Sequence, residues 1–121
     1  MDSLMVMLTA DYDGHPVGFT YDTGLDAGKP SVVITTGPVG ERTLRGMRHA
    51  VAAMAGQGNN LIVDDVMMDG VGADYAEVLA GFQVHWIGVF ARLDVLEARE
   101  CQRGGRLIGL ARWQFDRVHQ D

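Results

Sequence analysis

Leu61-Ile62-Val63-Asp64-Asp65 is the stretch that decides the fold class, because it is an unbroken apolar run that ends in two carboxylates. Such a run is typical of a parallel β-strand that is covered on both faces. A second apolar run, Val84 to Phe90, predicts another buried strand. Between them, residues 73–81 carry apolar side chains at helical spacing and predict a short helix. The order strand, helix, strand predicts an α/β domain with short parallel strands.

The flanking sequence predicts a hairpin and further helices. The clearest helix spans residues 38–56, where apolar side chains recur at helical spacing after the pair Gly37-Pro38. We also expect helices over residues 2–8 and about 106–118. A Gly-, Asp- and Pro-rich segment before the long helix predicts a weak hairpin, in which residues 17–21 pair with residues 31–35.

Asp94, with Glu97 three residues later, resembles a capping box for a helix that follows it. All these elements fit a single domain over residues 1–121. Two parallel strands do not form a stable sheet by themselves, and parallel edges are rarely left open. The missing neighbouring strands must come from the N-terminal hairpin, from another chain or from both, and we expect a homo-oligomer, most simply a dimer, that covers the edges.

Composition excludes several classes of protein. The net charge of −6 and the pI near 5.0 argue against a nucleic-acid-binding groove, which needs a basic face. No apolar run approaches the roughly 20 residues that a membrane span needs. Cys101 is the only cysteine, so an internal disulfide is impossible, and the N-terminus has no signal-peptide pattern. We expect a cytoplasmic protein.

Asp64 and Asp65 are the first candidates for chemistry. Open α/β folds bind their ligands at the carboxyl ends of parallel strands, where these two carboxylates would lie. In nucleotide-using enzymes, an Asp at this position holds Mg²⁺ directly or through water. The alternative interpretation is a helix-capping or loop aspartate. His15, beside two aspartates in an acidic loop, is the best histidine candidate for metal or acid–base work.

Three arginines, Arg99, Arg103 and Arg106, lie on either side of Gly104-Gly105. Arginine side chains in such a helix–turn–helix are suited to clamping phosphoryl oxygens in bidentate fashion. A solvated helix face, with Glu97 and Glu100 as ion-pair partners, explains them equally well. Asp2 is an N-cap candidate for the first helix, and its wider interest depends on whether the fold returns it to Asp64 and Asp65.

Taken in order, the motifs resemble a chloramphenicol phosphotransferase-like protein over nearly the whole chain. The resemblance rests on these segments, as they stand in the sequence: Asp2-Ser3-Leu4, the hairpin from Gly18 to Pro38, Leu61 to Val66, Trp86 to Val89, Arg99 to Arg106, Trp113-Gln114 and Val118-His119. Members of this family are P-loop kinases that phosphorylate a hydroxyl group of the antibiotic. The resemblance therefore implies a three-layer P-loop-kinase-like fold.

The resemblance also implies roles for individual residues. Asp2 would be the general base on the acceptor hydroxyl. Asp64 and Asp65 would form the metal-associated end of the Walker B strand, and Arg103 and Arg106 would belong to the phosphate-facing lid. That lid usually reads Arg-Gly-Asp-Arg, and Gly105 departs from this pattern.

Two further departures concern the ends of the family pattern. Residues 1–121 contain no Gly-x-x-x-x-Gly-Lys-Ser/Thr loop, and the family's first strand and its final strand and helix have no counterpart here. We therefore expect a truncated form of the fold. Loss of the loop removes the amide cradle and the lysine that hold the β- and γ-phosphates.

Three functions are compatible with these observations. We favour a divalent-metal-dependent phosphoester hydrolase, in which Mg²⁺ or Mn²⁺ is held by Asp2, Asp64, Asp65 and His15. In this hypothesis Asp2, Asp64, Arg103 and Arg106 would be catalytic, and the substrate would be a small phosphoester. The alternative is a noncatalytic oligomeric remnant or binding protein. The third hypothesis is a phosphotransferase that depends on a partner for its phosphate-binding loop.

Overall fold

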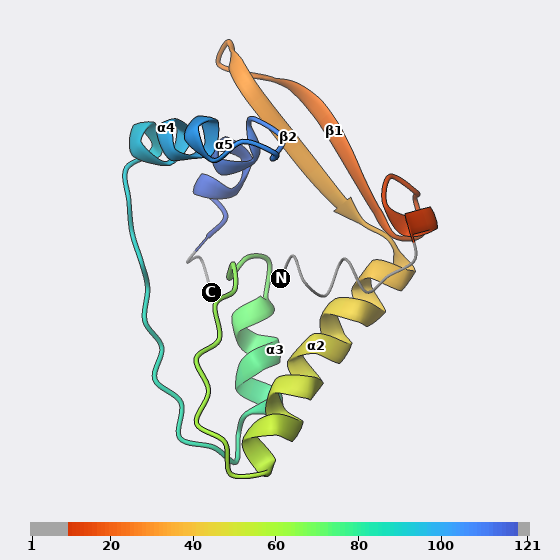
Figure 1. The fold of residues 1–121 in the computed structure, drawn as a ribbon, viewed down its shortest axis with the longest axis vertical. Coiled ribbons are helices and arrows are strands. Elements are labelled where there is room, and N and C mark those ends of the chain that lie inside the picture. Colours follow the sequence, from red (N-terminus) through yellow and green to blue (C-terminus); the bar gives the residue numbers. More distant parts are fainter. Residues whose placement is uncertain (1–9, 119–121) are drawn as a thin grey trace.

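The computed structural model describes residues 10–118, so the helix predicted over residues 2–8 lies outside the described residues (Figure 1). The fold is mixed α/β. In chain order the elements are the 3₁₀ helix η1 (Ala10–Tyr12), strands β1 (Phe19–Asp26) and β2 (Lys29–Thr36), and helices α2 (Pro38–Gly56), α3 (Val71–Val78), α4 (Leu93–Arg103) and α5 (Leu110–Phe115).

The predicted hairpin is present and is longer than expected. β1 and β2 pair antiparallel from Phe19 opposite Thr36 to Asp26 opposite Lys29. The two-residue turn, Ala27-Gly28, has positive φ angles of 48° and 77°. Left-handed conformations at both turn residues match the right-handed twist of the flanking strands, which explains the tight connection.

The long helix is confirmed with the predicted bounds. Pro38 occupies the first turn of α2, where its missing N–H has no intrahelical partner to lose. Met47 and Val51 are buried on one face of α2 and contribute to a small core. The other buried apolar side chains among residues 10–118 are Phe19, Val32 and Tyr75.

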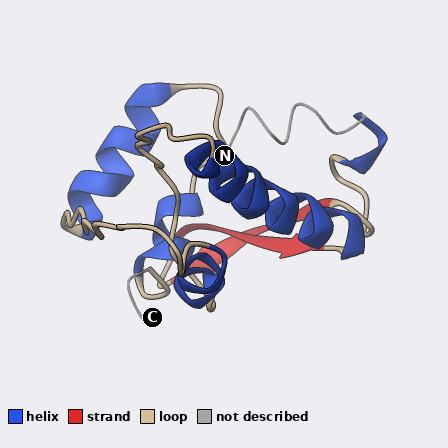
Figure 2. Ribbon diagram, turned by 90° about the horizontal axis from the view of Figure 1, so that it is seen from below, coloured by secondary structure: helices blue, strands red, loops and turns tan. Residues whose placement is uncertain are grey.

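The prediction of a short parallel sheet is wrong. Within residues 10–118 the sheet consists of the antiparallel pair β1–β2, and residues 61–66 and 84–90 form no strand. Among the residues that the structure describes, Figure 2 shows strand only in the hairpin, and both segments are loop. A β-strand exists only through its pairing, and these two segments do not pair with each other. The apolar side chains of these two segments favour burial, but in this structure most of the large ones remain exposed.

Both segments are extended and run in the same direction along the molecule. Figure 1 shows residues 61–66 running from the end of α2 to the start of α3, and residues 84–90 running back up from the end of α3 towards α4. Ile62 is fully exposed, and Ile87 and Val89 are 84% and 82% exposed. The three-layer P-loop-kinase-like arrangement, which needs these segments inside a sheet, is not formed by the described residues.

The helices also differ in their bounds. α3 begins and ends earlier than the predicted 73–81 helix, and α5 is a short part of the predicted 106–118 helix. The capping-box prediction is wrong, because Arg92 is the N-cap of α4 and Asp94 already lies inside the helix. Asp94 accepts hydrogen bonds from the Arg92 guanidinium at 3.1 and 2.8 Å instead.

The C-terminal helices pack on the hairpin. α5 lies against β2 and α4, and Figure 1 shows all three at one end of the molecule, with α2 and α3 at the other. An isolated antiparallel bridge between Met68 and Val118, with an Arg117–Asp69 ion pair at 3.4 Å, connects the two ends. Among residues 10–118, no helix combines the length and apolar character that crossing a membrane requires.

Candidate functional site

Asp65 is held in place by the first turn of the loop that follows it and by α3. Its Oδ1 accepts a 2.8 Å hydrogen bond from the Val66 N–H, and its Oδ2 accepts a 3.0 Å hydrogen bond from the Tyr75 hydroxyl. Both carboxylate oxygens are therefore engaged. The Tyr75 ring also meets Trp86 edge-on, with 6.5 Å between ring centroids. Tyr75 thus connects residues 61–66, α3 and residues 84–90.

The environment of Tyr75 keeps its phenol protonated. Burial raises the pKa of the Tyr75 hydroxyl far above its ordinary value, and the negative charge of Asp65 and the hydrogen bond to it raise the pKa further. The positive charge of Arg48 acts in the opposite direction and is weaker. The hydroxyl is consequently a fixed hydrogen-bond donor to Asp65 in the ordinary pH range.

Arg48 fastens α2 to α3 beside this contact. Its Nη2 pairs with Asp74 Oδ2 at 2.6 Å, and its Nη1 donates to the Leu44 carbonyl at 3.3 Å. The residue is buried, while the Asp74 side chain is 55% exposed. Within residues 10–118 the Arg48 Nε has no hydrogen-bond partner. The pair fixes the first turn of α3, and thereby the position from which Tyr75 reaches Asp65.

Asp64 has a different environment from its neighbour. It is exposed to solvent, as expected for a side chain that alternates with Asp65 along an extended segment. His15 is also exposed, and its Nδ1 accepts a 3.3 Å hydrogen bond from the Val17 N–H in the turn before β1. The described part of the chain holds no group of three or more His, Cys, Asp or Glu side chains placed to bind a metal ion. Asp2, the remaining predicted ligand, lies outside the described residues.

The arginines of the predicted lid lie at the end of α4 and in the turn after it. Arg99, Gln102 and Arg103 line a shallow, open hollow of about 330 Å³. Arg103 is the last residue of α4, and Arg106 follows the turn at Gly104 and Gly105, exposed to solvent. The helical spacing of Arg99 and Arg103 places both on one face of α4, so both residues border the same hollow.

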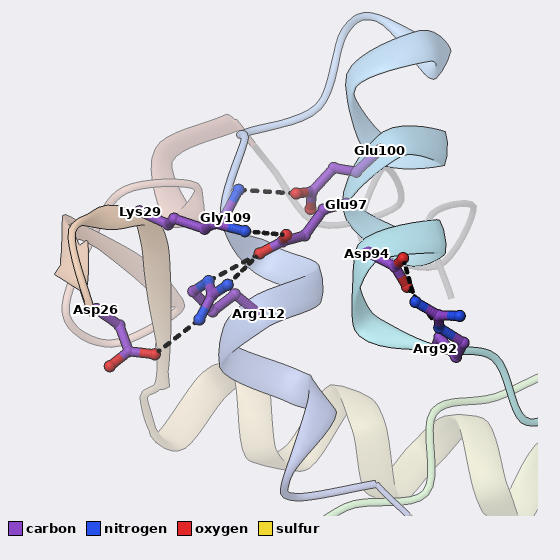
Figure 3. Close-up of polar contacts among 8 residues, drawn as sticks. All are labelled: Asp26, Lys29, Arg92, Asp94, Glu97, Glu100, Gly109 and Arg112. Atoms are coloured by element: carbon purple, nitrogen blue, oxygen red, sulfur yellow. Dashed lines mark hydrogen bonds and ion pairs between the residues drawn. The ribbon is translucent and has the colours of Figure 1, made fainter.

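A charged network holds α4 in register with α5 and the hairpin (Figure 3). Glu97 pairs with Arg112 at 2.7 Å and with Lys29 at 3.2 Å, and Arg112 also pairs with Asp26 at 3.3 Å. Burial acts to raise the pKa of the Glu97 carboxyl, but the hydrogen bonds and charges of Arg112 and Lys29 outweigh it and lower the pKa. Burial acts to lower the pKa of the Arg112 guanidinium, but the hydrogen bonds and charges of Glu97 and Asp26 outweigh it and raise the pKa.

Glu100 completes this framework as a buried carboxylate. One oxygen accepts a 2.8 Å hydrogen bond from the Gly109 N–H (Figure 3), and the other accepts a 2.9 Å hydrogen bond from the Ala111 N–H. These N–H groups belong to the start of α5, where the helix itself offers no acceptor. Glu97 and Glu100 therefore contact α5 and β2. They do not pair with Arg99 and Arg103, although the alternative interpretation of that helix face required such ion pairs.

The structure brings together only part of the predicted site. Asp64 and Asp65 are adjacent, and Arg103 lines the hollow, but His15 and the aspartates form no cluster in residues 10–118. Tyr75 and Gln102 were not predicted to be site residues. Tyr75 follows Asp65 by ten positions on another element, and no sequence motif marks such a contact. Gln102 adjoins Arg103, and only the orientation of the helix end reveals its position.

The comparisons with known proteins place the chain in one family. A family model described as chloramphenicol phosphotransferase-like protein matches residues 2–121, which is nearly the entire sequence. No curated protein and no solved structure matches the chain. The match covers the Asp64–Asp65 segment and the arginines of α4 together, in agreement with the resemblance found in the sequence. The chain therefore belongs to the chloramphenicol phosphotransferase-like family.

Proposed function

We propose that the chain acts in phosphoryl transfer from a nucleoside triphosphate to a small hydroxyl-bearing acceptor, and that the phosphate-binding loop comes from outside residues 1–121. Family membership supports phosphoryl transfer as the reaction class. Residues 1–121 contain no Gly-x-x-x-x-Gly-Lys-Ser/Thr sequence, so the amide cradle for the β- and γ-phosphates has to be supplied by another segment.

The asymmetry between Asp64 and Asp65 carries this proposal. Asp65 already uses both oxygens in hydrogen bonds, whereas Asp64 is exposed. Mg²⁺ typically binds through one or two carboxylates, keeps several waters and takes its other ligands from substrate phosphates. The donor set fits a Mg²⁺ ion that arrives with the nucleotide, with Asp64 as its protein ligand. The ion would neutralise charge on the transferred phosphoryl group.

The hollow on α4 supports the same reaction. Arg99 and Arg103 line one open hollow, and bidentate arginine–phosphate contacts are strong and directional. The ion pairs of Glu97 and the two hydrogen bonds of Glu100 fix α4 on α5 and β2, so the arginines start from a rigid helix. Cations placed beside a transferring phosphoryl group stabilise the charge on it.

The second candidate is a metal-dependent phosphoester hydrolase. It is favoured because residues 1–121 contain the acidic residues but no loop that cradles a nucleotide. A metal ion resident in the protein needs more ligands than Asp64 and Asp65 offer in this arrangement. Asp2 would be one source, and His15 from a second copy would be another. Mg²⁺ or Mn²⁺ would then bind in the absence of any phosphate compound, which distinguishes this candidate from phosphotransfer.

Calorimetric titration of the 121-residue chain separates the two candidates. For phosphotransfer we expect weak binding of Mg²⁺–ATP, with a Kd on the order of 1 mM, and far weaker binding of Mg²⁺ alone. Asp64→Ala should abolish the Mg²⁺-dependent part, and Asp22→Ala, an exposed aspartate of β1, serves as the matched control. Absence of ATP binding at millimolar concentration overturns the proposal. Tight binding of Mn²⁺ alone, with EDTA-sensitive hydrolysis of a phosphoester that Asp64→Ala abolishes, establishes the hydrolase instead.

A further inference from the structure

The residues proposed for phosphoryl transfer are divided between two parts of the molecule. Asp64 and Asp65 lie on the segment that leads to α3, whereas Arg99 and Arg103 lie on α4. Figure 1 shows α3 and α4 at opposite ends of the molecule. Phosphoryl transfer requires the metal ligand and the phosphate-binding cations to keep fixed relative positions. A contact that fixes one part against the other therefore affects the site without touching the substrate.

One such contact lies where the chain leaves α5. An isolated antiparallel bridge joins Met68 to Val118, and the Arg117 Nη2 lies 3.4 Å from each carboxylate oxygen of Asp69. Met68 and Asp69 belong to the turn between the two aspartates of the proposed site and α3. Figure 1 shows the chain after α5 running towards this turn. The end of α5 thus contacts the turn directly.

The arginine side of this contact is fixed on α5. The N–H groups of Arg117 and Val118 both donate to the Gln114 carbonyl, at 2.9 and 3.0 Å. The Arg117 guanidinium lies over the Trp113 ring, with its Cζ 4.7 Å from the ring centroid. The attraction between a cation and the face of an indole ring favours this orientation of the guanidinium. The guanidinium is therefore held in place by α5 as well as by Asp69.

The aspartate side belongs to a well-defined turn. The Val71 N–H donates to the Met68 carbonyl at 3.1 Å, and Asp69 has a φ of 52°, a conformation that aspartate tolerates better than most residues. Four residues before Asp69, the Asp65 carboxylate accepts the hydrogen bond of the Tyr75 hydroxyl. A short turn that is held at both of its ends determines where the two neighbouring carboxylates lie.

On the other side, α5 is joined to the helix that carries the arginines. Glu100 of α4 accepts hydrogen bonds from the Gly109 and Ala111 N–H groups, and Glu97 of α4 pairs with Arg112 of α5. The contacts therefore run from α4 through α5 to the turn before α3. The pair of Arg117 with Asp69 is the ionic step in this series that crosses from one part of the molecule to the other.

This ion pair can be removed without unfolding the chain. The Arg117 and Asp69 side chains are 44% and 59% exposed, and their 3.4 Å separation exceeds the roughly 2.8 Å of a strong charge-assisted hydrogen bond. Exposed pairs of this kind contribute little to the free energy of unfolding. Loss of the pair should therefore release the turn while the hairpin and the helices stay folded.

We propose that Arg117 is a positioning residue, whose contact with Asp69 fixes the segment of Asp64 and Asp65 relative to α4 and its arginines. Arg117 acts through Asp69 and binds neither the metal ion nor the nucleotide. The geometric part of this inference stands on the contacts of α5 alone. Its consequence for nucleotide binding rests on the proposed function.

The distance between α4 and the segment of the two aspartates is the direct test. Spin labels report it by pulsed dipolar spectroscopy when they are attached to Cys101, the exposed native cysteine of α4, and to Ile62→Cys, which replaces a fully exposed side chain. We expect one narrow distance distribution. Arg117→Gln and Asp69→Asn should each broaden it, and the double variant should broaden it no further, because both substitutions remove the same contact.

Three comparisons separate the ion pair from general effects of charge and folding. Arg92→Gln is the matched control, since Arg92 forms an exposed 2.8 Å pair with Asp94 inside one part of the molecule, and it should leave the distribution narrow. Arg117→Lys keeps the positive charge and should broaden the distribution less than Arg117→Gln. Salt at about 1 M should broaden the distribution of the unsubstituted pair, because it screens exposed charges.

Calorimetric titration gives the second readout. Arg117→Gln should lower the affinity for Mg²⁺–ATP about two- to fivefold, while its circular dichroism spectrum and unfolding midpoint stay close to those of Arg92→Gln. Distributions that neither Arg117→Gln nor Asp69→Asn broadens overturn the inference. Broadened distributions with unchanged affinity, in a chain that binds Mg²⁺–ATP, overturn it as well. If the wild type does not bind Mg²⁺–ATP, the proposed function is overturned, and the distance distributions alone then decide the inference.

Discussion

The Tyr75 hydroxyl donates a 3.0 Å hydrogen bond to Asp65 Oδ2 and so connects α3 to the segment that carries the two carboxylates. The same side chain is 1% exposed and contacts Trp86 edge-on. A single buried phenol therefore determines how both apolar segments sit on α3. It also separates the roles of the two aspartates, because Asp65 is used for structure while Asp64 faces solvent.

Tyr75→Phe should destabilise the protein by about 1 kcal/mol, because the ring is kept while the hydrogen bond to Asp65 is lost. Urea unfolding of the wild type, Tyr75→Phe, Asp65→Asn and the double variant gives the coupling between the two side chains. We expect a coupling energy of at least about 0.5 kcal/mol. Strictly additive effects would show that the contact does not contribute to stability.

The raised pKa of Tyr75 makes stability dependent on alkaline pH. Since the folded-state pKa lies above the ordinary value of 10.0, the contribution is complete below pH 10 and is lost as the pH rises further. The wild type should therefore lose stability above pH 10 more steeply than Tyr75→Phe, measured by thermal unfolding. Equal slopes for the two proteins would contradict a phenol held protonated by burial and by Asp65.

Glu97 gives the corresponding dependence at acid pH. Its folded-state pKa is lowered below the ordinary value of 4.5, so its contribution is complete above pH 4.5 and is lost as the pH falls through the lowered pKa. Glu97→Gln should be less stable than the wild type at pH 7, and the difference should shrink below pH 4.5. Glu77→Gln, an exposed residue of α3, is the control for the loss of one negative charge. A difference that is constant with pH would exclude an ionic role for Glu97.

Local sequence signals predicted the hairpin and α2 because the determinants of both elements lie within them. β1 and β2 meet at a two-residue turn with a glycine, and Pro38 begins α2 at a position where proline fits. Residues 61–66 and 84–90 show the limit of such signals. Their apolar runs favour burial in a sheet, but strand formation depends on neighbours that no local pattern supplies.

The candidate site was predictable to a similar degree. The exposed position of Asp64 and the placement of Arg99 and Arg103 on one helix face follow from the two periodicities, 2.0 for an extended segment and 3.6 for a helix. The engagement of Asp65 by Tyr75 depends on the packing of α3, and the pairing of Glu97 with Arg112 and Lys29 depends on the docking of α5 and the hairpin. Contacts of this kind require tertiary structure.

Gly109→Ala should destabilise the protein by about 1–3 kcal/mol. Gly109 has φ +111°, and a Cβ there would lie 2.6 Å from the Ser31 backbone nitrogen. Its carbonyl accepts a 3.0 Å hydrogen bond from Val32 N–H, so a shift would also disturb the contact of α5 with β2. Gly24→Ala is the control, because the space around Gly24 is open. Similar midpoints in thermal unfolding for both variants would contradict the close approach.

Arg103→Ala should reduce the affinity for Mg²⁺–ATP about tenfold, since a charge-assisted hydrogen bond to a phosphoryl oxygen is lost. Arg103 and Arg99 line the same hollow, and the framework of Glu97 and Glu100 that holds α4 contacts neither arginine, so the helix should stay in place. Arg45→Ala removes an equal charge from the exposed face of α2 and controls for net charge. Calorimetric titration compares the three proteins at one ionic strength, because arginine–phosphate contacts weaken with salt. Equal affinities for Arg103→Ala and Arg45→Ala would leave the hollow without a role in phosphate binding, whereas a loss of affinity confined to Arg103→Ala would assign the phosphoryl group to this end of α4.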